Sequence, residues 1–271
     1  MPTLSLAHTG FNELSPPDLV SCAARAGFDA VNIKLGTDRP DIPKYPMFSN
    51  APMLRETLAR LEDTGLGVSG ATSIRIVPDL DVAGCEPLFE SLGQLGGKSF
   101  VVTGGDSDQG RTAEVFARLC ELALPFDLRL DFEFMLYSAV KTLDKAASIL
   151  RQANAPNSGI VVDCLHISRG GTPTAAIHAI DPAQLRIMHL CDAPAQSPPP
   201  HGLGEEARYD RLPPGDGGLK LADILSVMPR DIDISVEVPM SGELGRRSPA
   251  ERARLLNDAS RAFLRNNGRP F

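Results

Sequence analysis

The stretch GIVVDCLH, residues 159–166, decides the fold because it joins an aliphatic run to two ionisable side chains. Residues 159–162 are one glycine and three β-branched aliphatic residues, which is typical of a strand covered on both faces. Asp163 and His166 then interrupt the run, although an ionisable group is costly to bury in a dry core. The pattern therefore predicts a buried strand whose carboxyl end opens into a polar site.

Runs of this kind recur along the whole chain and alternate with amphipathic helical patterns. The β-rich runs are 3–8, 30–35, 66–74, 99–105, 128–134, 159–165, 185–192 and 232–239, and the clearest helical patterns are 15–28, 52–65, 139–154 and 248–267. Eight β-then-α units without a break in composition predict one domain, residues 1–271, folded as a single (β/α)₈ TIM barrel. A doubly wound open sheet is the alternative, but the segment after the first strand, LSLAHTGFNEL, lacks its G-x-G-x-x-G turn.

Composition excludes several classes of protein. The chain has 271 residues, a formal net charge of −7 and no block of like charge, which argues against a nucleic-acid or membrane-surface partner. We find no signal-peptide pattern at the N-terminus and no apolar run long enough to span a bilayer. The five cysteines are widely spaced and form no C-x-x-C pair, so we expect reduced thiols and a cytoplasmic protein.

Ionisable residues close four successive strands at the end where TIM barrels carry their active sites. They are Glu133, Asp163, His189 and Glu237. Three carboxylates and an imidazole at one rim would repel unless a cation lay among them, so we expect all four to bind one divalent metal ion. This oxygen-rich set favours Mn²⁺ or Mg²⁺, while Zn²⁺, Co²⁺ and Fe²⁺ remain compatible with it.

These four residues, together with RLPPGDGGLKLADIL at 211–225, resemble the sugar phosphate isomerase/epimerase superfamily of xylose isomerase-like TIM barrels over nearly the whole chain. The resemblance implies that Glu133, Asp163, His189 and Glu237 hold the metal and that Glu133 and Glu237 transfer protons as the catalytic residues. It also implies that His166 and Arg211 bind substrate, and that the protein could form a homo-oligomer. Apurinic endonucleases of this superfamily need more histidines than the five present, so we do not expect a DNA substrate.

The activity that the resemblance implies is isomerisation or epimerisation of a keto-sugar or related polyol by proton abstraction next to a carbonyl. The same ligands would equally serve a metal-dependent dehydratase, a lyase of the inosose or dehydroshikimate dehydratase type. A barrel that binds a small molecule without catalysis is a third reading, which the complete ligand set argues against.

Other polar residues near the predicted rim have open roles. His8 closes the first strand and is a candidate for substrate binding, although it could line the pocket passively. Lys34 and Arg75 could meet an anionic group of a substrate or form surface salt bridges. Asp192 could pair with a lysine, accept a hydrogen bond from a loop amide or contact the metal ligands. Arg169 could reach the pocket or cap a turn.

The connection 193–218 is rich in Pro and Gly and too long for a simple turn. Loops of this length are typically lids, binding loops or disordered segments.

Overall fold

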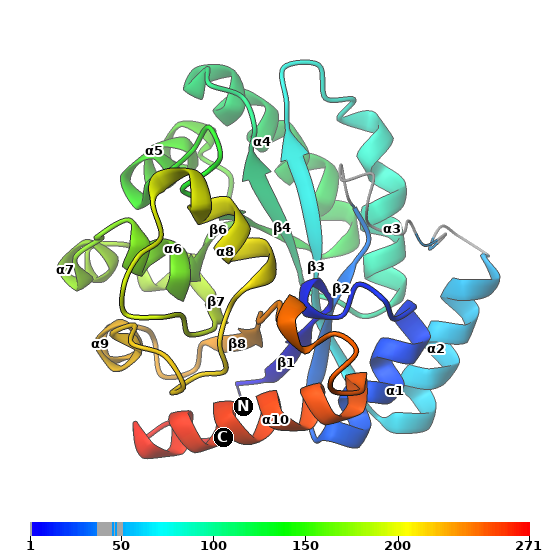
Figure 1. Cartoon of the computed structure of the whole chain (residues 1–271). Coiled ribbons are helices and arrows are strands. Elements are labelled where there is room, and N and C mark those ends of the chain that lie inside the picture. The colour runs from blue at the N-terminus through cyan, green and yellow to red at the C-terminus, as the bar shows by residue number, and fades with distance from the viewer. Residues whose placement is uncertain (1, 37–44, 46, 48–50) are drawn as a thin grey trace.

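Eight parallel strands close into a barrel in which β1 pairs with both β2 and β8 (Figure 1). The structure is a computed structural model that describes residues 2–36, 45, 47 and 51–271. The strands are β1 (Leu4–Ala7), β2 (Ala30–Lys34), β3 (Gly67–Ile76), β4 (Ser99–Gly104), β5 (Arg129–Glu133), β6 (Ser158–Asp163), β7 (Leu185–Leu190) and β8 (Asp233–Val236). Each overlaps one of the predicted runs, so the predicted (β/α)₈ TIM barrel is confirmed and the doubly wound sheet is excluded.

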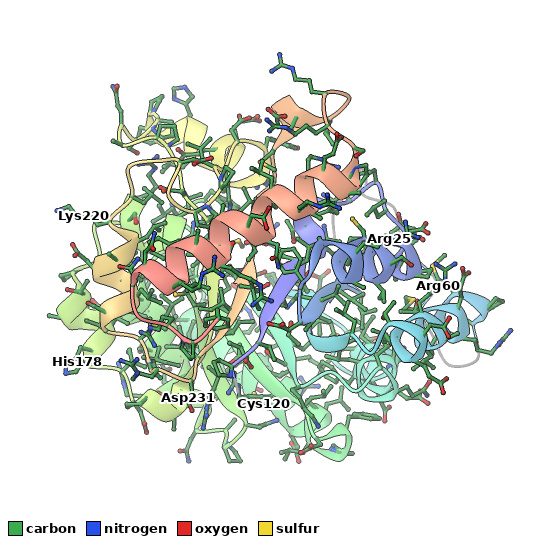
Figure 2. All side chains as sticks on the ribbon, turned by 90° about the horizontal axis from the view of Figure 1, so that it is seen from below. Arg25, Arg60, Cys120, His178, Lys220 and Asp231 are labelled. Atoms are coloured by element: carbon green, nitrogen blue, oxygen red, sulfur yellow. The ribbon has the colours of Figure 1, made fainter. Side chains whose placement is uncertain are left out.

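Helices follow the strands and surround the barrel. They are α1 (Pro16–Ala26), α2 (Pro52–Thr64), α3 (Glu86–Gln94), α4 (Gln109–Ala123), α5 (Leu143–Ala153), α6 (Cys164–Arg169), α7 (Thr174–His178), α8 (Leu203–Tyr209), α9 (Leu221–Ser226) and α10 (Pro249–Asn266). Figure 2 shows α10 lying across the lower side of the barrel, and His178 of α7 at the periphery of the molecule. Among the residues that the structure describes, no helix is both long and apolar enough to cross a membrane.

Local sequence signals set the ends of several helices. α1 begins with two prolines and ends at Gly27, whose φ of +89° is the left-handed conformation that glycine adopts without strain. α10 begins with a capping box, in which the Ser248 hydroxyl accepts from the Glu251 amide and the Glu251 carboxylate accepts from the Ser248 amide. These helices therefore begin and end where the sequence predicts.

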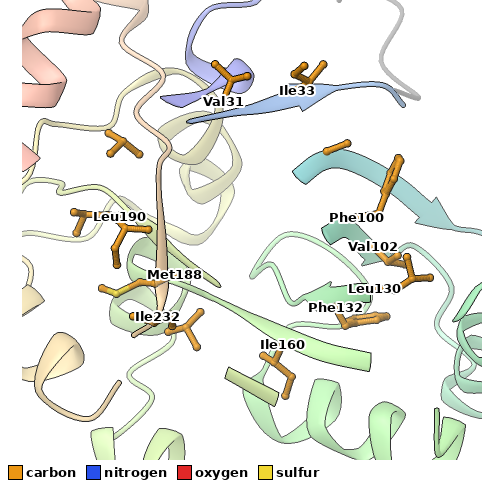
Figure 3. Close-up of a cluster of buried hydrophobic side chains, with 14 of the residues drawn as sticks. Val31, Ile33, Phe100, Val102, Leu130, Phe132, Ile160, Met188, Leu190 and Ile232 are labelled. Atoms are coloured by element: carbon orange, nitrogen blue, oxygen red, sulfur yellow. The ribbon is translucent and has the colours of Figure 1, made fainter. Parts of the chain in front are cut away.

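The alternation of side chains along each strand separates an outer core from the barrel interior. Val31 and Ile33 of β2 belong to the large apolar cluster between strands and helices, part of which is drawn in Figure 3. A separate buried cluster consists of Val101, Val161 and Ile187. These side chains lie on the faces of β4, β6 and β7 that are turned away from the helices. This small apolar layer lies two residues before Asp163 on β6 and His189 on β7, and so forms part of the floor beneath the barrel mouth.

The long connection between β7 and α9, residues 193–218, folds around α8 and is fixed at its base by Asp192. Both carboxylate oxygens of Asp192 accept backbone N–H groups, from Gly215 and Gly217 at 3.1 and 3.0 Å and from Leu219 at 3.0 Å. Of the roles open to Asp192, contact with loop amides is the one the structure gives. The connection is thus an anchored part of the barrel mouth.

Candidate metal centre

Four ionisable side chains from neighbouring strands meet at the carboxyl end of the barrel. They are Glu133 at the end of β5, Asp163 at the end of β6, His189 on β7 and Glu237 directly after β8. Asp163 and His189 are register partners, and each lies two residues beyond a member of the interior apolar layer. Because side chains alternate along a strand, the pattern that fills the barrel also directs these groups into its mouth.

His189 lies at the centre of this group. Its Nδ1 is 3.0 Å from Oε1 of Glu133, 3.3 Å from Oε2 of Glu237 and 3.9 Å from Oδ2 of Asp163. One donor atom from each of the four residues lies within 4.8 Å of the other three, and all four residues are buried. The structure therefore brings together all four residues for which metal binding was predicted.

The site favours additional positive charge. Burial alone would lower the pKa of His189, but the carboxylates of Glu237 and Glu133 raise it well above the usual value. Burial alone would raise the pKa of Glu237, but Arg211 and His189 hold it well below the usual range. Three ionised carboxylates in a buried cluster are stable only with compensating cations.

Arg211 provides one of these cations from the loop that follows α8. Its Nη1 donates to Oδ2 of Asp163 at 2.7 Å and lies 3.2 Å from Oε2 of Glu237. Burial alone would lower the pKa of Arg211. Its neighbours, of which Asp163 has the largest effect, together raise this pKa well above the usual value. With Arg211 charged, three ionised carboxylates would retain two negative charges, which one divalent cation would balance if His189 bound it as a neutral imidazole.

The donor set fits a divalent cation. Three carboxylates and one imidazole nitrogen are ligands that Mn²⁺, Mg²⁺ and Zn²⁺ all accept. Nδ1 of His189 faces the carboxylates, whereas its Nε2 is buried without a hydrogen-bond partner among the described residues. Oγ of Ser235, the register partner of His189 on β8, is likewise buried and unpartnered. If these residues hold a metal ion, Nδ1 is the nitrogen of His189 that lies among the other predicted ligands.

A pocket of about 330 Å³ opens next to this cluster. Glu133, Glu237, His166 and Arg211 line it, so two of the four predicted metal ligands and two of the three predicted substrate-binding residues face the same space. Asp163 and His189 lie outside the pocket lining and are each about 1% exposed. Of the four predicted ligands, the two glutamates are therefore the ones that a small molecule in this pocket could contact.

His166 is held in place from two directions. Its backbone N–H donates to Oδ1 of Asp163 at 3.0 Å, which begins α6, and its ring lies edge-on to that of Tyr137 with 5.6 Å between centroids. Arg208 of α8 places its guanidinium carbon 4.4 Å from the centroid of the Tyr137 ring. Tyr137 and Arg208 also line the pocket, but neither closes a strand, so the sequence carried no signal for them.

His8 does not join this group. Its Nε2 is 2.9 Å from the carbonyl oxygen of Leu14, and its Nδ1 accepts the backbone N–H of Lys34 at 3.2 Å. Burial lowers the pKa of His8 to about 4, so the ring is neutral and both nitrogens serve the backbone. A substrate contact by His8 stays a prediction, whereas Lys34 and Arg75 both line the pocket.

Comparison with known proteins finds a matching family model and similar proteins. The family model described as xylose isomerase-like TIM barrel matches residues 20–266. The inosose isomerase of Halalkalibacterium halodurans is 28% identical over 116 residues, a match that spans 42% of this chain and 39% of that protein. Because the match spans less than half of the relative, it does not by itself indicate the activity of this chain.

Solved structures share the fold over almost the full chain. The IolI protein, whose crystal structure has a bound zinc atom, superposes with a TM-score of 0.82 at 18% identity and covers 98% of this chain and 99% of that one. The D-allulose 3-epimerase of Methylomonas sp., solved in complex with D-allulose, gives a TM-score of 0.69 at 15% identity and covers 98% and 97%. At these identities the likeness establishes the fold alone.

Proposed function

The chain belongs to the xylose isomerase-like TIM barrel family, and from this premise we propose that it is a divalent-metal-dependent isomerase or epimerase. Its substrate would be a keto-sugar or a related polyol, and the reaction a proton transfer at the carbon next to the carbonyl. The observation that carries the proposal is the placement of two glutamates, Glu133 and Glu237, both in the predicted ligand cluster and on the pocket wall.

Glu133, Asp163, His189 and Glu237 would hold one metal ion, with Mn²⁺ or Mg²⁺ favoured by the oxygen-rich donor set. The ion bound to the IolI protein is zinc, which the same donors accept. A divalent ion in this position supplies Lewis-acid polarisation of substrate oxygens, which makes the neighbouring carbon more acidic.

The chain's own residues would then move the proton. One of the two glutamates accepts the proton from the carbon next to the carbonyl, and the other relays a proton taken from solvent to the opposite face, which inverts that carbon. His166 and Arg211 line the same pocket and would bind the substrate's hydroxyl and carbonyl oxygens. Glu133 and Glu237 are thus proposed as catalytic residues, and His166 and Arg211 as binding residues.

The comparisons favour isomerase chemistry over dehydration, because the relatives reported above include an inosose isomerase and a 3-epimerase. A lyase reaction would use the same enolisation but expel a hydroxyl from the next carbon, so it would be detected as a product with a conjugated carbonyl. We also propose one domain, residues 1–271, and a cytoplasmic location, which the five free and buried cysteines support.

The test is exchange of a substrate hydrogen with solvent deuterium, followed by NMR for a panel of keto-sugars, inososes and cyclic hydroxy acids with Mn²⁺. Glu133→Gln and Glu237→Gln should each reduce turnover by at least about a hundredfold, because an amide cannot accept the proton. Metal content is measured in the same samples, and Glu114→Gln, an exposed glutamate of α4, is the matched control. Near-normal turnover in both site variants would contradict the proposed roles.

A further inference from the structure

Part of the pocket wall comes from the connection between β7 and α9. Three of the residues lining the pocket, Ala207, Arg208 and Arg211, lie on α8 or directly after it. α8 has only seven residues, and a helix this short is not stable in isolation. Its position over the mouth must therefore depend on contacts with the rest of the barrel.

A buried ion pair is one of these contacts. Arg169, the last residue of α6, donates from Nη2 to Oε1 of Glu206 at 2.6 Å and from Nε to Oε2 at 2.9 Å. The two side chains are only 4% and 8% exposed. Nη2 of Arg169 also donates to the carbonyl oxygen of Pro194 at 2.7 Å, near the start of the same connection. Figure 1 shows α8 and α6 on the same side of the barrel.

This pair closes a circuit of contacts with the metal centre. Glu206 precedes Ala207, whose carbonyl oxygen accepts from Nε of Arg211 at 2.9 Å, and Nη1 of Arg211 donates to Oδ2 of Asp163. Asp163 in turn caps α6, the helix that ends at Arg169. The circuit therefore begins and ends on α6 and fixes Arg211 with respect to Asp163.

We propose that Arg169 and Glu206 are positioning residues, whose ion pair seats α8 so that Arg211 reaches both Asp163 and the pocket. The part of this inference that concerns substrate binding by Arg211 rests on the proposed function. A bidentate guanidinium–carboxylate pair fixes orientation as well as distance, which suits a positioning role. A buried ion pair is in itself weak evidence for stability, since an apolar pair of similar volume is often as stable.

The experiment compares Arg169→Met, Glu206→Met and the double variant in the full-length protein, with Arg118→Met on the exposed face of α4 as control. Each single variant leaves one buried charge unpaired, so hydrogen exchange of residues 203–211 should be at least about tenfold faster than in the wild type. The double variant re-forms an apolar contact and should return close to the wild-type rate. Glu206→Gln is the milder second variant if a methionine variant does not fold.

Two further measurements separate positioning from mere stability. Arg211 carries a positive charge beside the carboxylates that would hold the ion, so withdrawing it should strengthen Mn²⁺ binding in the single variants, measured by calorimetry. For any substrate the enzyme turns over, KM should rise by about tenfold or more while kcat changes less, because Arg211 contributes binding. Unchanged Mn²⁺ affinity and unchanged exchange of residues 203–211 in folded single variants would overturn the proposal.

The outcomes also separate this inference from the proposed function. Absence of turnover by the wild type on every substrate, with the exchange and Mn²⁺ results as expected, would reject the proposed function and leave the positioning role intact. Normal turnover by the wild type, with KM and Mn²⁺ affinity unmoved in the single variants, would reject the positioning role alone.

Discussion

Replacing Arg211 with methionine should strengthen metal binding, although Arg211 lies in the proposed active site. Its Nη1 is 2.7 Å from Oδ2 of Asp163 and 3.2 Å from Oε2 of Glu237, so any cation held by these residues shares them with a guanidinium. Methionine keeps much of the side-chain volume and removes the charge. The two effects that compete are lost repulsion, which favours the metal, and lost orientation of Asp163, which disfavours it.

Magnitudes decide between these effects. Two unit charges about 4 Å apart interact by about 4 kcal/mol at an effective dielectric constant of about 20, and a divalent ion doubles this repulsion. Loss of a group that orients a metal ligand typically weakens affinity by about 10- to 100-fold, or about 1.4–2.7 kcal/mol. Even when solvent screening removes half of the repulsion, the balance favours the metal. We expect Arg211→Met to bind Mn²⁺ at least about tenfold more tightly.

The metal-free protein should respond in the opposite direction. Without Arg211, the buried Asp163 and Glu237 lose their guanidinium partner, which should lower the free energy of unfolding by about 3–5 kcal/mol. The assays are calorimetric titration with Mn²⁺ after chelation, and urea unfolding with and without saturating metal, with Arg118→Met as control. Weaker Mn²⁺ binding in Arg211→Met, or equal stability of the two metal-free proteins, would refute the electrostatic argument.

Two further predictions concern the histidines. His189→Ala should weaken Mn²⁺ binding more than His166→Ala, which should mainly raise KM. Calorimetry and steady-state kinetics on both variants check this. The reverse order would mean that His166 is the metal ligand and His189 the substrate contact. Burial lowers the pKa of His8 in the folded protein from its usual value of 6.5 to about 4. As pH falls from 6.5 toward 4, the unfolded state binds a proton that the folded state does not, so about 3 kcal/mol of stability present above pH 6.5 is lost. His8→Gln should show a shallower fall in urea stability over this range, and parallel curves for the two proteins would contradict the assignment.

The strands and the four clustered residues were predictable because their signals are local. An aliphatic run that ends in an ionisable residue identifies both a strand and the end that faces the mouth, and residues two apart on a strand share a face. Asp163 and His189 satisfy both conditions and lie where the sequence places them. The register between strands then brings such residues together without further information.

His8 illustrates where a local signal is insufficient. It closes an apolar strand just as His189 does, yet its nitrogens meet the carbonyl of Leu14 and the amide of Lys34 instead of carboxylates. Which partners surround a strand-end histidine depends on the neighbouring strands and the next turn, and these are tertiary facts. The same holds for Tyr137, whose place beside His166 is set by the loop after β5.

The structure of the connection 193–218 could not be predicted from the strand pattern. Its Pro- and Gly-rich sequence is compatible with a lid or with disorder, and only long-range contacts decide: Asp192 holds its base and Arg169 holds α8. Because the predicted metal ligands lie on or directly after strands, this connection can differ in sequence without displacing them. Of the three residues that it contributes to the pocket, Ala207, Arg208 and Arg211, the two arginines are therefore the ones on which substrate choice should depend most.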